Sequence, residues 1–256
     1  MIEAFLGHWA PQLDNSLYIG LSKQLTLKRQ MDIVANNIAN QDTIGFKVEN
    51  LIVQEYPKAP ASTEGGPKPL KFVYDLGVSR DFNAGTMQKT GNPLDMAVEG
   101  DAFFTINTPD GPRYTRDGRF TLDPTGRLVT QAGNPVVGEG GDILIDRQLG
   151  EITVSRDGVI SQGNQRLTRL NLSRFGAVSG LEKSGDGLFL NANNQPVLAA
   201  TNASVHQGSL EGSNVNAILQ ITEMIEVSRA YERVSKLVDQ SADLSRSAVS
   251  RLGKIN

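Results

Sequence analysis

The chain has 256 residues, of which 39% are hydrophobic and 26 are glycine, with no cysteine and a formal net charge of −3. This composition is typical of a globular protein, and the lack of cysteine excludes disulfides, thiol nucleophiles and Cys-ligated zinc. The Lys and Arg residues give no basic excess for phosphate binding, so we expect no nucleic-acid partner. No apolar run reaches the roughly 18–20 residues that span a bilayer. The N-terminus also lacks the basic start and apolar core of a cleaved secretory signal.

The first element we expect is a long helix over residues 16–39. Asp14, Asn15 and Ser16 offer side chains for an N-cap, and Asn40, Asp42 and Gly45 are of the types that end helices and form turns. One apolar face recurs at helical spacing. Its members are Leu27, Met31, Val34 and Ile38, with Leu17 and Leu21 extending it less regularly toward the N-terminus.

Residues 46–70 are expected to form a linker or a surface arm, since their four prolines and Gly65-Gly66 forbid a continuous helix. Residues 71–210 then alternate short apolar stretches with turn residues and predict a mainly β domain of antiparallel hairpins. The expected hairpin dipeptides are Asp110-Gly111, Asp117-Gly118, Asp157-Gly158 and Asp186-Gly187, with another turn at 123–126. The expected strands are 102–106, 119–122, 128–130, 142–145 and 151–154.

Helical periodicity returns at about residue 215 and continues to about 252, within a C-terminal segment that we bound at 211–256. It carries two apolar stripes offset by a fraction of a turn, Ile218, Ile221 and Ile225 in one and Val227, Tyr231, Val234 and Val238 in the other. An antiparallel pair of helices buries one stripe on each member, so a second stripe needs another neighbour. We therefore predict that the helices of segments 1–45 and 211–256 pair and then pack against other subunits in coiled-coil fashion. The alternative is that both helices lie along the β-domain of their own chain.

Four stretches, in order along the chain, resemble the family of flagellar rod and hook axial proteins. They are "NNIANQDTIGFK" (36–47), "TGNPLDMAVEGDAFFTI" (90–106), "YTRDGRFTLDPTGRLVTQAGNPVVG" (114–138), and "QGSLEGSNVN" (207–216) followed by "EMIEVSRAYERVSKLV" (223–238). The resemblance covers nearly the whole chain. The first dozen residues depart from the family pattern, which leaves any role of His8 or Trp9 unassigned.

The resemblance implies a structural subunit of the bacterial flagellar rod, with the terminal helices in a tubular core and the β-domain in an outer shell. It implies partners among copies of itself and other rod subunits, and export through the flagellar type III apparatus without a cleaved signal. The length of the middle segment suits both proximal and distal rod subunits. The opening "LDNSLYIGLSKQLTLKRQMDIVANNIAN" and the tail "SRSAVSRLGKIN" are more similar to the proximal subunit. A distal rod subunit is the alternative within the family.

The motif residues of the first helix end have two readings. The amides of Asn36, Asn37 and Asn40 could bond to neighbouring subunits or serve as ordinary caps, with capping favoured for Asn40. Within the same motif, which includes Thr43, we expect Gly45 to supply a backbone angle and Phe46 to anchor the chain. We interpret the apolar stripes as intersubunit packing, with intrachain core as the alternative; this hypothesis covers Leu27, Met31, Val34, Ile38, Ile221, Ile225, Val227, Tyr231, Val234 and Val238.

Two other classes of function remain. The chain has only two histidines, His8 and His206, and neither has metal-ligand spacing. The carboxylates Asp95, Glu99 and Asp101 fall among strand ends and turns, so we expect no enzyme, no metal and no cofactor. A β-domain binding module on a helical stalk would share the composition, but it would not be expected to carry the four ordered motifs.

Overall fold

The computed structural model describes residues 10–58, 70–146 and 148–252. The chain divides into two compact units. Unit 1 holds the two long helices and residues 49–79, and unit 2 holds residues 39–48 and 80–215. Unit 2 is therefore built from two separate stretches of chain, because a segment that belongs to unit 1 interrupts it.

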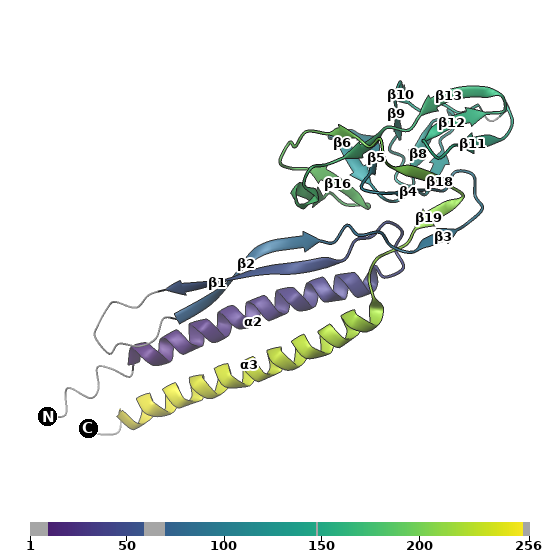
Figure 1. Cartoon of the computed structure of the whole chain (residues 1–256). Helices are drawn as coiled ribbons and strands as arrows, with labels where there is room; N and C mark the ends of the chain where they lie inside the picture. Colours follow the sequence, from purple (N-terminus) through teal and green to yellow (C-terminus); the bar gives the residue numbers. More distant parts are fainter. Residues whose placement is uncertain (1–9, 59–69, 147, 253–256) are drawn as a thin grey trace. The chain divides into compact units, whose positions relative to one another are not determined.

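Unit 1 is a pair of long helices with a two-stranded sheet. Helix α2 (Ala10–Ala39) has 30 residues and helix α3 (Ala217–Leu252) has 36. Figure 1 shows the two helices side by side and antiparallel, with strands β1 (Glu49–Lys58) and β2 (Leu70–Arg80) paired in opposite directions along α2. The described parts of this unit bury Leu27, Ile33, Val34 and Val227. Two long terminal helices are thus present, as predicted.

The start of α2 differs from the prediction. The helix begins at Ala10, so Asp14, Asn15 and Ser16 lie inside it and do not cap it. Pro11 is compatible with this start, because a first-turn N–H has no partner within the helix and its loss costs little. At α3 the cap is Asn216, whose Oδ1 accepts bonds from the backbone N–H of Ile218 (3.1 Å) and Leu219 (3.2 Å).

The expected linker over 46–70 differs more. Residues 49–58 form β1, and the chain forms β2 from Leu70. Prolines exclude helix but not an extended edge strand, which is where Pro57 lies. Because β2 pairs with β1, the compact units divide at Ser79 and not at residue 70. The prolines at 60, 67 and 69 and the glycine pair 65–66 lie outside the described residues.

Unit 2 is built from short antiparallel strands. Its six-stranded sheet has the order β15-β16-β6-β5-β14-β17, beside a three-stranded sheet β11-β12-β13 and the pairs β18-β4, β19-β3, β7-β8 and β10-β9. The strands are β3 (Met87–Lys89), β4 (Met96–Glu99), β5 (Phe103–Thr108), β6 (Gly111–Thr115), β7 (Phe120–Leu122), β8 (Leu128–Thr130), β9 (Val137–Gly138), β10 (Gly141–Asp142), β11 (Ile152–Val154), β12 (Val159–Gln162), β13 (Gln165–Arg169), β14 (Leu172–Arg174), β15 (Leu181–Lys183), β16 (Leu188–Asn191), β17 (Leu198–Ala199), β18 (Ser204–Gln207) and β19 (Ser209–Glu211).

Three of the four predicted hairpin dipeptides are confirmed. Asp110-Gly111 joins β5 to β6, Asp157-Gly158 joins β11 to β12, and Asp186-Gly187 joins β15 to β16. The prediction for Asp117-Gly118 is wrong, since β6 and β7 pair with other strands. A Cβ on Gly118 would lie 1.5 Å from the carbonyl oxygen of Met96, so glycine there permits a close backbone approach instead of a turn.

One predicted strand is shorter than expected. Of residues 142–145, only Asp142 belongs to a strand, in the short β10. Ile143 and Ile145 are nevertheless buried in the main core of unit 2. Their side chains pack as strand residues would, and the backbone of the segment instead bonds outside a regular ladder, with Leu128 N–H donating to the Ile143 carbonyl (2.9 Å).

Two hydrophobic clusters stabilise unit 2. The larger one gathers aliphatic side chains from β4, β5, β8, β12 and β14 around Phe104 and Phe120, whose rings meet edge to face at 5.0 Å. The smaller one is aromatic, with Phe103, Tyr114, Phe175 and Phe189 around Leu181. Burial of apolar surface on this scale gives the unit a core of its own.

Candidate assembly surface and buried anchors

The two apolar stripes of α3 have different environments. Val227 is buried, and Tyr231, Val234 and Val238 on the same face are half-buried. Val238 faces α2, because a Cβ added to Gly20 would lie 2.5 Å from its Cγ2. On α2, Leu27 and Val34 are buried and Met31 and Ile38 half-buried. These predicted packing residues therefore lie at least partly inside unit 1.

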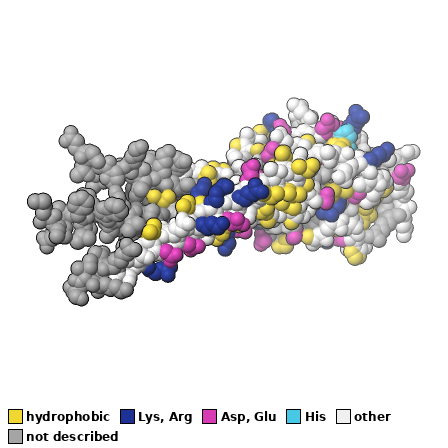
Figure 2. All heavy atoms as spheres, turned by 90° about the horizontal axis from the view of Figure 1, so that it is seen from below, with side chains coloured by type: hydrophobic (Ala, Val, Ile, Leu, Met, Phe, Trp, Pro, Cys, Tyr) yellow, Lys and Arg dark blue, Asp and Glu magenta, His cyan; other side chains and the backbone are white. Residues whose placement is uncertain are grey.

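The other stripe of α3 faces outward. Ile218, Ile221 and Ile225 are 77%, 49% and 47% exposed, and by helical spacing they lie more than a quarter of a turn away from the Val227–Val238 stripe. Leu219, Leu237 and Leu244 are exposed on a further face of α3. Figure 2, seen from the side on which α3 lies in Figure 1, shows hydrophobic side chains interspersed with charged ones. We name Ile218, Ile221 and Ile225 the outer stripe.

Helix α2 also carries exposed apolar residues, namely Tyr18, Leu21 and Leu25. Their spacing of three and four places them on one face. The prediction that Leu21 extends the Leu27–Ile38 face was wrong, because at 100° per residue it points well away from that face. Both helices of unit 1 thus present large apolar side chains to solvent. Several exposed apolar side chains on one face are typical of a surface that binds another protein.

Asn37 ties three elements of unit 1 together. Its Nδ2 donates to the Glu49 carbonyl (2.8 Å) and to Gln220 Oε1 (2.9 Å), while its Oδ1 accepts from the Glu49 N–H (2.9 Å). The side chain is buried. It therefore neither caps α2 nor reaches outward, and joins α2, β1 and α3 within the chain. Asn36, next to it, is exposed.

The turn after α2 belongs to unit 2. The Thr43 hydroxyl donates to Asn40 Oδ1 (3.1 Å), and the Thr43 N–H donates to the Asn40 carbonyl (3.2 Å). Gly45 has a φ of +69°, and a Cβ there would lie 2.6 Å from the backbone nitrogen of Asp117. Phe46 is buried beneath the Lys183 ammonium, 4.8 Å from the ring centre. Each of these positions has a structural task within the chain.

A buried group of three charges lies beside this turn, and sequence reasoning missed it. The Lys47 ammonium donates to Glu211 Oε1 (2.6 Å) and Arg116 Nη1 donates to Glu211 Oε2 (3.2 Å), with side chains that are 3% exposed or less. Burial lowers the pKa of both Lys47 and Arg116, and the Glu211 carboxylate opposes that shift. The Glu211 carboxylate thus pairs with both cations; we name Lys47, Arg116 and Glu211 the buried triad.

No periodic pattern could have revealed the triad, since Lys47 and Glu211 are 164 residues apart in sequence. The one indication in the sequence was the type of residue next to Lys47 and Glu211. Lys47 follows the buried Phe46 at the end of the first motif, and Glu211 stands between Leu210 and Gly212 in the motif before α3. A charge fixed in an otherwise apolar or glycine setting often marks a buried pair.

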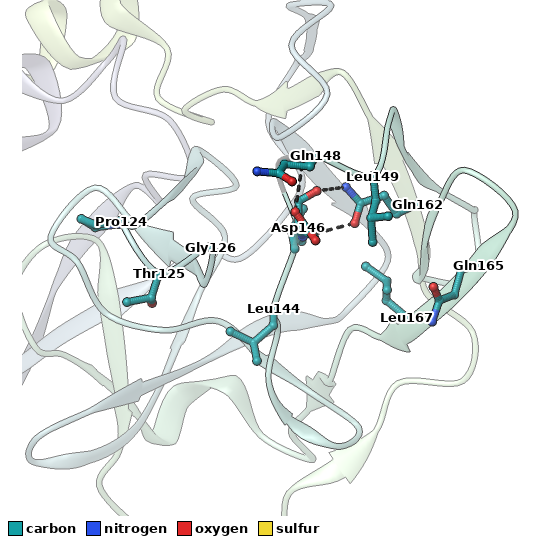
Figure 3. Close-up of a pocket in the computed structure, with 11 residues that line it drawn as sticks. Pro124, Thr125, Gly126, Leu144, Asp146, Gln148, Leu149, Gln162, Gln165 and Leu167 are labelled. Atoms are coloured by element: carbon teal, nitrogen blue, oxygen red, sulfur yellow. Dashed lines mark hydrogen bonds between the residues drawn. The ribbon is translucent and has the colours of Figure 1, made fainter.

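The surface of unit 2 has an open depression of about 500 Å³, shown in Figure 3. Its acidic member, Asp146, accepts a bond from the Gln148 N–H (2.9 Å), and the amide of Gln162 bonds to the Asp146 backbone. Leucines and glutamines make up much of the rest, including Leu144, Leu149 and Gln165. Neither a histidine nor a second carboxylate lines it, so the described lining offers no acid–base pair.

Two of the three carboxylates considered for catalysis bond to side chains of the same unit. Asp95 accepts a bond from Asn92 Nδ2 (3.0 Å), and Glu99 meets His206 Nε2 at 2.8 Å across β4 and β18. Over residues 10–58, 70–146 and 148–252, His, Asp and Glu nowhere gather in threes suited to a metal ion. Within the same ranges, no helix combines the length and apolarity needed to cross a membrane.

The class that this fold and these surfaces define is a structural subunit, with a β-rich unit joined to paired terminal helices. Comparison with known families places it more closely. Residues 17–47 match the family described as flagella basal body rod protein, residues 97–162 the D1 domain of flagellar hook protein FlgE/F/G, and residues 206–251 the C-terminal region of flagellar basal body rod FlgEFG proteins.

Similar proteins match nearly the whole chain. The chain is 53% identical to flagellar basal-body rod protein FlgF of Caulobacter vibrioides, over 95% of this chain and 100% of that protein. It is 36% identical to FlgF of Rhizobium meliloti over 94% and 99%, and 32% identical to FlgG of Bacillus subtilis over 92% and 98%. The chain belongs to the family of flagellar basal-body rod proteins, and within it is an FlgF-like structural subunit of the rod.

Proposed function

We propose that the chain polymerises through its terminal helices into a tube that forms the proximal part of the flagellar rod, transmits torque across the periplasm and lets exported subunits pass. In this arrangement unit 1 contributes the wall of the tube, and the β-rich unit contributes an outer shell. Its partners are copies of itself, other rod subunits and the type III export apparatus, which it passes without a cleaved signal.

The observation that carries the proposal is that one apolar stripe of α3 is covered within unit 1 and the other is exposed. The Val227–Val238 stripe is already used in pairing with α2, whereas the outer stripe has no cover within its own unit. Fully burying one such side chain is worth about 1.5–3 kcal/mol. Three of them on each copy, together with Tyr18, Leu21 and Leu25 on α2, supply a substantial driving force for association.

The proximal position is supported by the names of the relatives. The FlgF proteins of Caulobacter vibrioides and Rhizobium meliloti are 53% and 36% identical to the chain, and the FlgG protein of Bacillus subtilis is 32% identical. A distal rod role would fit the FlgG-like alternative, and the 53% identity to an FlgF protein favours the FlgF-like one.

The test is to replace two residues of the outer stripe by polar ones, Ile221→Ser with Ile225→Ser. Because both side chains are about half exposed in the chain, we expect the purified monomer to keep its helix content and its melting temperature. Rod assembly should nevertheless fail, since the substitution repeats at every subunit. The readouts are swimming in soft agar and recovery of the subunit in isolated basal bodies.

A matched control is Leu144→Ser in unit 2, which also removes an exposed leucine (61% exposed) but lies outside the helices. We expect it to leave motility unchanged. Normal rods with the double stripe variant would overturn the proposal and would favour a binding module whose helices act only as a stalk.

A further inference from the structure

The buried triad closes unit 2 across long sequence separations. Glu211 is on β19, 164 residues after Lys47 and 95 after Arg116. The Glu211 carboxylate also accepts a bond from the Gly85 N–H (3.0 Å), and the Glu211 carbonyl accepts one from the Gly45 N–H (2.7 Å). One residue therefore joins the first stretch of unit 2, at 45–47, to the start and the end of the second.

The triad is also costly to form before its surroundings are complete. Lys47 and Arg116 have to lose water, and burial disfavours their charged forms until Glu211 is in place. The hydrogen bonds of these cations to other groups go to backbone carbonyls, of Asn83 for Lys47 (2.7 Å) and of Val98 (3.0 Å) and Gly100 for Arg116. Such carbonyls hold a cation in position but do not neutralise it. The Arg116 guanidinium also lies over the Phe103 ring, and Asp81 and Asp101 attract the cations less strongly than Glu211 does.

Several other strand pairs of unit 2 join stretches that are close in sequence. The hairpins β5-β6, β7-β8, β11-β12 and β15-β16 each join neighbours in sequence. Closing such short loops costs less chain entropy than closing a long one, and local contacts tend to form first. Glu211 in turn approaches its place only when β19 pairs with β3, a pairing of Leu210 with Gln88 that spans most of the unit.

We propose that Glu211 acts as a late-closing lock on unit 2. Its two buried ion pairs form after the hairpins have folded, and they then set the rate at which the unit unfolds. This biological reading rests on the proposed function. A chain that passes through an export apparatus benefits when its β-rich unit closes only after the segment just before α3 has emerged. A rod subunit that transmits torque benefits when the closed unit reopens slowly.

The experiment compares folding and unfolding rates of the full-length monomer with those of Glu211→Gln. Contacts made after the rate-limiting barrier change the unfolding rate and not the folding rate. Breaking one partner of a buried ion pair costs enough to expect unfolding faster by a hundredfold to a thousandfold, on the order of two to three powers of ten. The refolding rate should change by less than about threefold.

The signal has to come from unit 2, so rates are read by pulsed hydrogen exchange on peptides that cover β4–β8. The matched control is Glu99→Gln, the same substitution in an exposed pair with His206 whose carboxylate side chain is 68% exposed. Exposed pairs contribute little, and this control should change the unfolding rate by less than about fivefold. If Glu211→Gln fails to fold, Lys47→Met tests the same lock while leaving the Arg116–Glu211 pair intact.

Two outcomes overturn the proposal. In one, the variant refolds more slowly by the whole factor while its unfolding rate is unchanged, which would place the triad in the folding nucleus. In the other, Glu211→Gln and Glu99→Gln behave alike, which would mean that no lock exists. Because these rates are measured on dilute monomer, they stand or fall separately from assembly through the outer stripe.

Discussion

Asp123 shows how one side chain can hold a turn of unit 2. In the turn between β7 and β8, its carboxylate accepts bonds from the Thr125 hydroxyl (2.7 Å), the backbone N–H of Thr125 (2.8 Å) and Arg127 (2.9 Å), and the Arg127 side chain (2.8 Å). The Thr125 hydroxyl, with desolvation opposing it and the other donors assisting it, holds the pKa of Asp123 well below its usual range. Since these bonds favour the ionised form, the stability they add depends on pH.

The first prediction concerns that dependence. Because the folded-state pKa is lowered, the contribution of Asp123 is fully present above the unfolded pKa of about 3.9, and it is lost as the pH falls through the folded pKa. We expect the melting temperature of unit 2 to fall between about pH 4 and pH 2, and to fall less in Asp123→Asn. Circular dichroism melts across that range provide the measurement.

The variant should retain some acid sensitivity. The hydroxyl of Ser155 and the Arg169 side chain lower the pKa of Asp157 as well, so a second carboxylate titrates in the same direction. Asp123→Asn combined with Asp157→Asn should therefore reduce the fall of the melting temperature at acid pH further than either change alone. Parallel pH curves for the wild-type protein and Asp123→Asn would contradict the assigned role of the turn.

Single residues also show where sequence reasoning stopped. The backbone angle of Gly45 followed from its residue type and its place after a helix. The partners of Asn37 did not, because an asparagine near a helix end can cap it, bond to another subunit or bond within the chain. Here the contacts to Glu49 and Gln220 decide in favour of the last, and Gln220 is 183 residues away in sequence.

At the scale of elements, the pairing of α2 with α3 depends on a close approach at one glycine. Glycine inside a helix costs about 0.5–1 kcal/mol relative to alanine. At residue 20 glycine is nevertheless required by packing, since a Cβ would lie 2.5 Å from Val238 Cγ2. The small residue lets the helices meet along the Val227–Val238 stripe.

The second prediction is a double-mutant cycle at this contact. Gly20→Ala should gain helix propensity but push against Val238, so we expect a net loss of about 1 kcal/mol or more in the pairing of the helices. Val238→Ala should also destabilise, by leaving a small void. The double mutant should lose less stability than the sum of the two single losses, because the new methyl fills the space that Val238 leaves. Urea unfolding followed by helix circular dichroism measures all four proteins.

A control on the opposite, exposed face of α2 tests the interpretation. Tyr18→Ala removes an exposed side chain of α2 (64% exposed), and it should add to Val238→Ala without coupling. Strictly additive losses for Gly20→Ala and Val238→Ala would show that the helices do not meet closely at this point.

Element type was easier to predict than element ends or partners. The helical stripes located both long helices, and Asp-Gly pairs located three hairpins. The start of α2 was missed because Asp14–Ser16 have the residue types of a cap yet lie inside the helix, where propensity is only a weak guide. Strand β1 was missed because Pro57 excludes helix but is tolerated on an edge strand.

At the scale of the whole molecule, sequence order and unit membership differ. The prediction treated residues 71–210 as one continuous domain, whereas unit 2 takes in residues 39–48 and leaves 71–79 to unit 1. Contacts such as Lys47–Glu211 bring distant stretches into one unit, and periodicity reports only on neighbours along a helix or strand. The class of fold was therefore readable from the sequence, and the division into units was not.

The last prediction is that the two units of the monomer unfold in separate transitions. Each has its own buried residues, Leu27, Val34 and Val227 in unit 1 and the two clusters in unit 2, and chains with more than one unit commonly depart from two-state behaviour.

Asn37→Ala removes bonds to Glu49 and Gln220, so it should lower the stability of unit 1 by about 2–4 kcal/mol and leave unit 2 unchanged. Glu211→Gln should do the reverse. Hydrogen exchange in rising urea, read on peptides from α3 and from β5, separates the two. Lys28→Ala, at an exposed position of α2, should shift neither by more than about 0.5 kcal/mol. A single transition that moves as a whole in both variants would show that the chain folds as one cooperative unit.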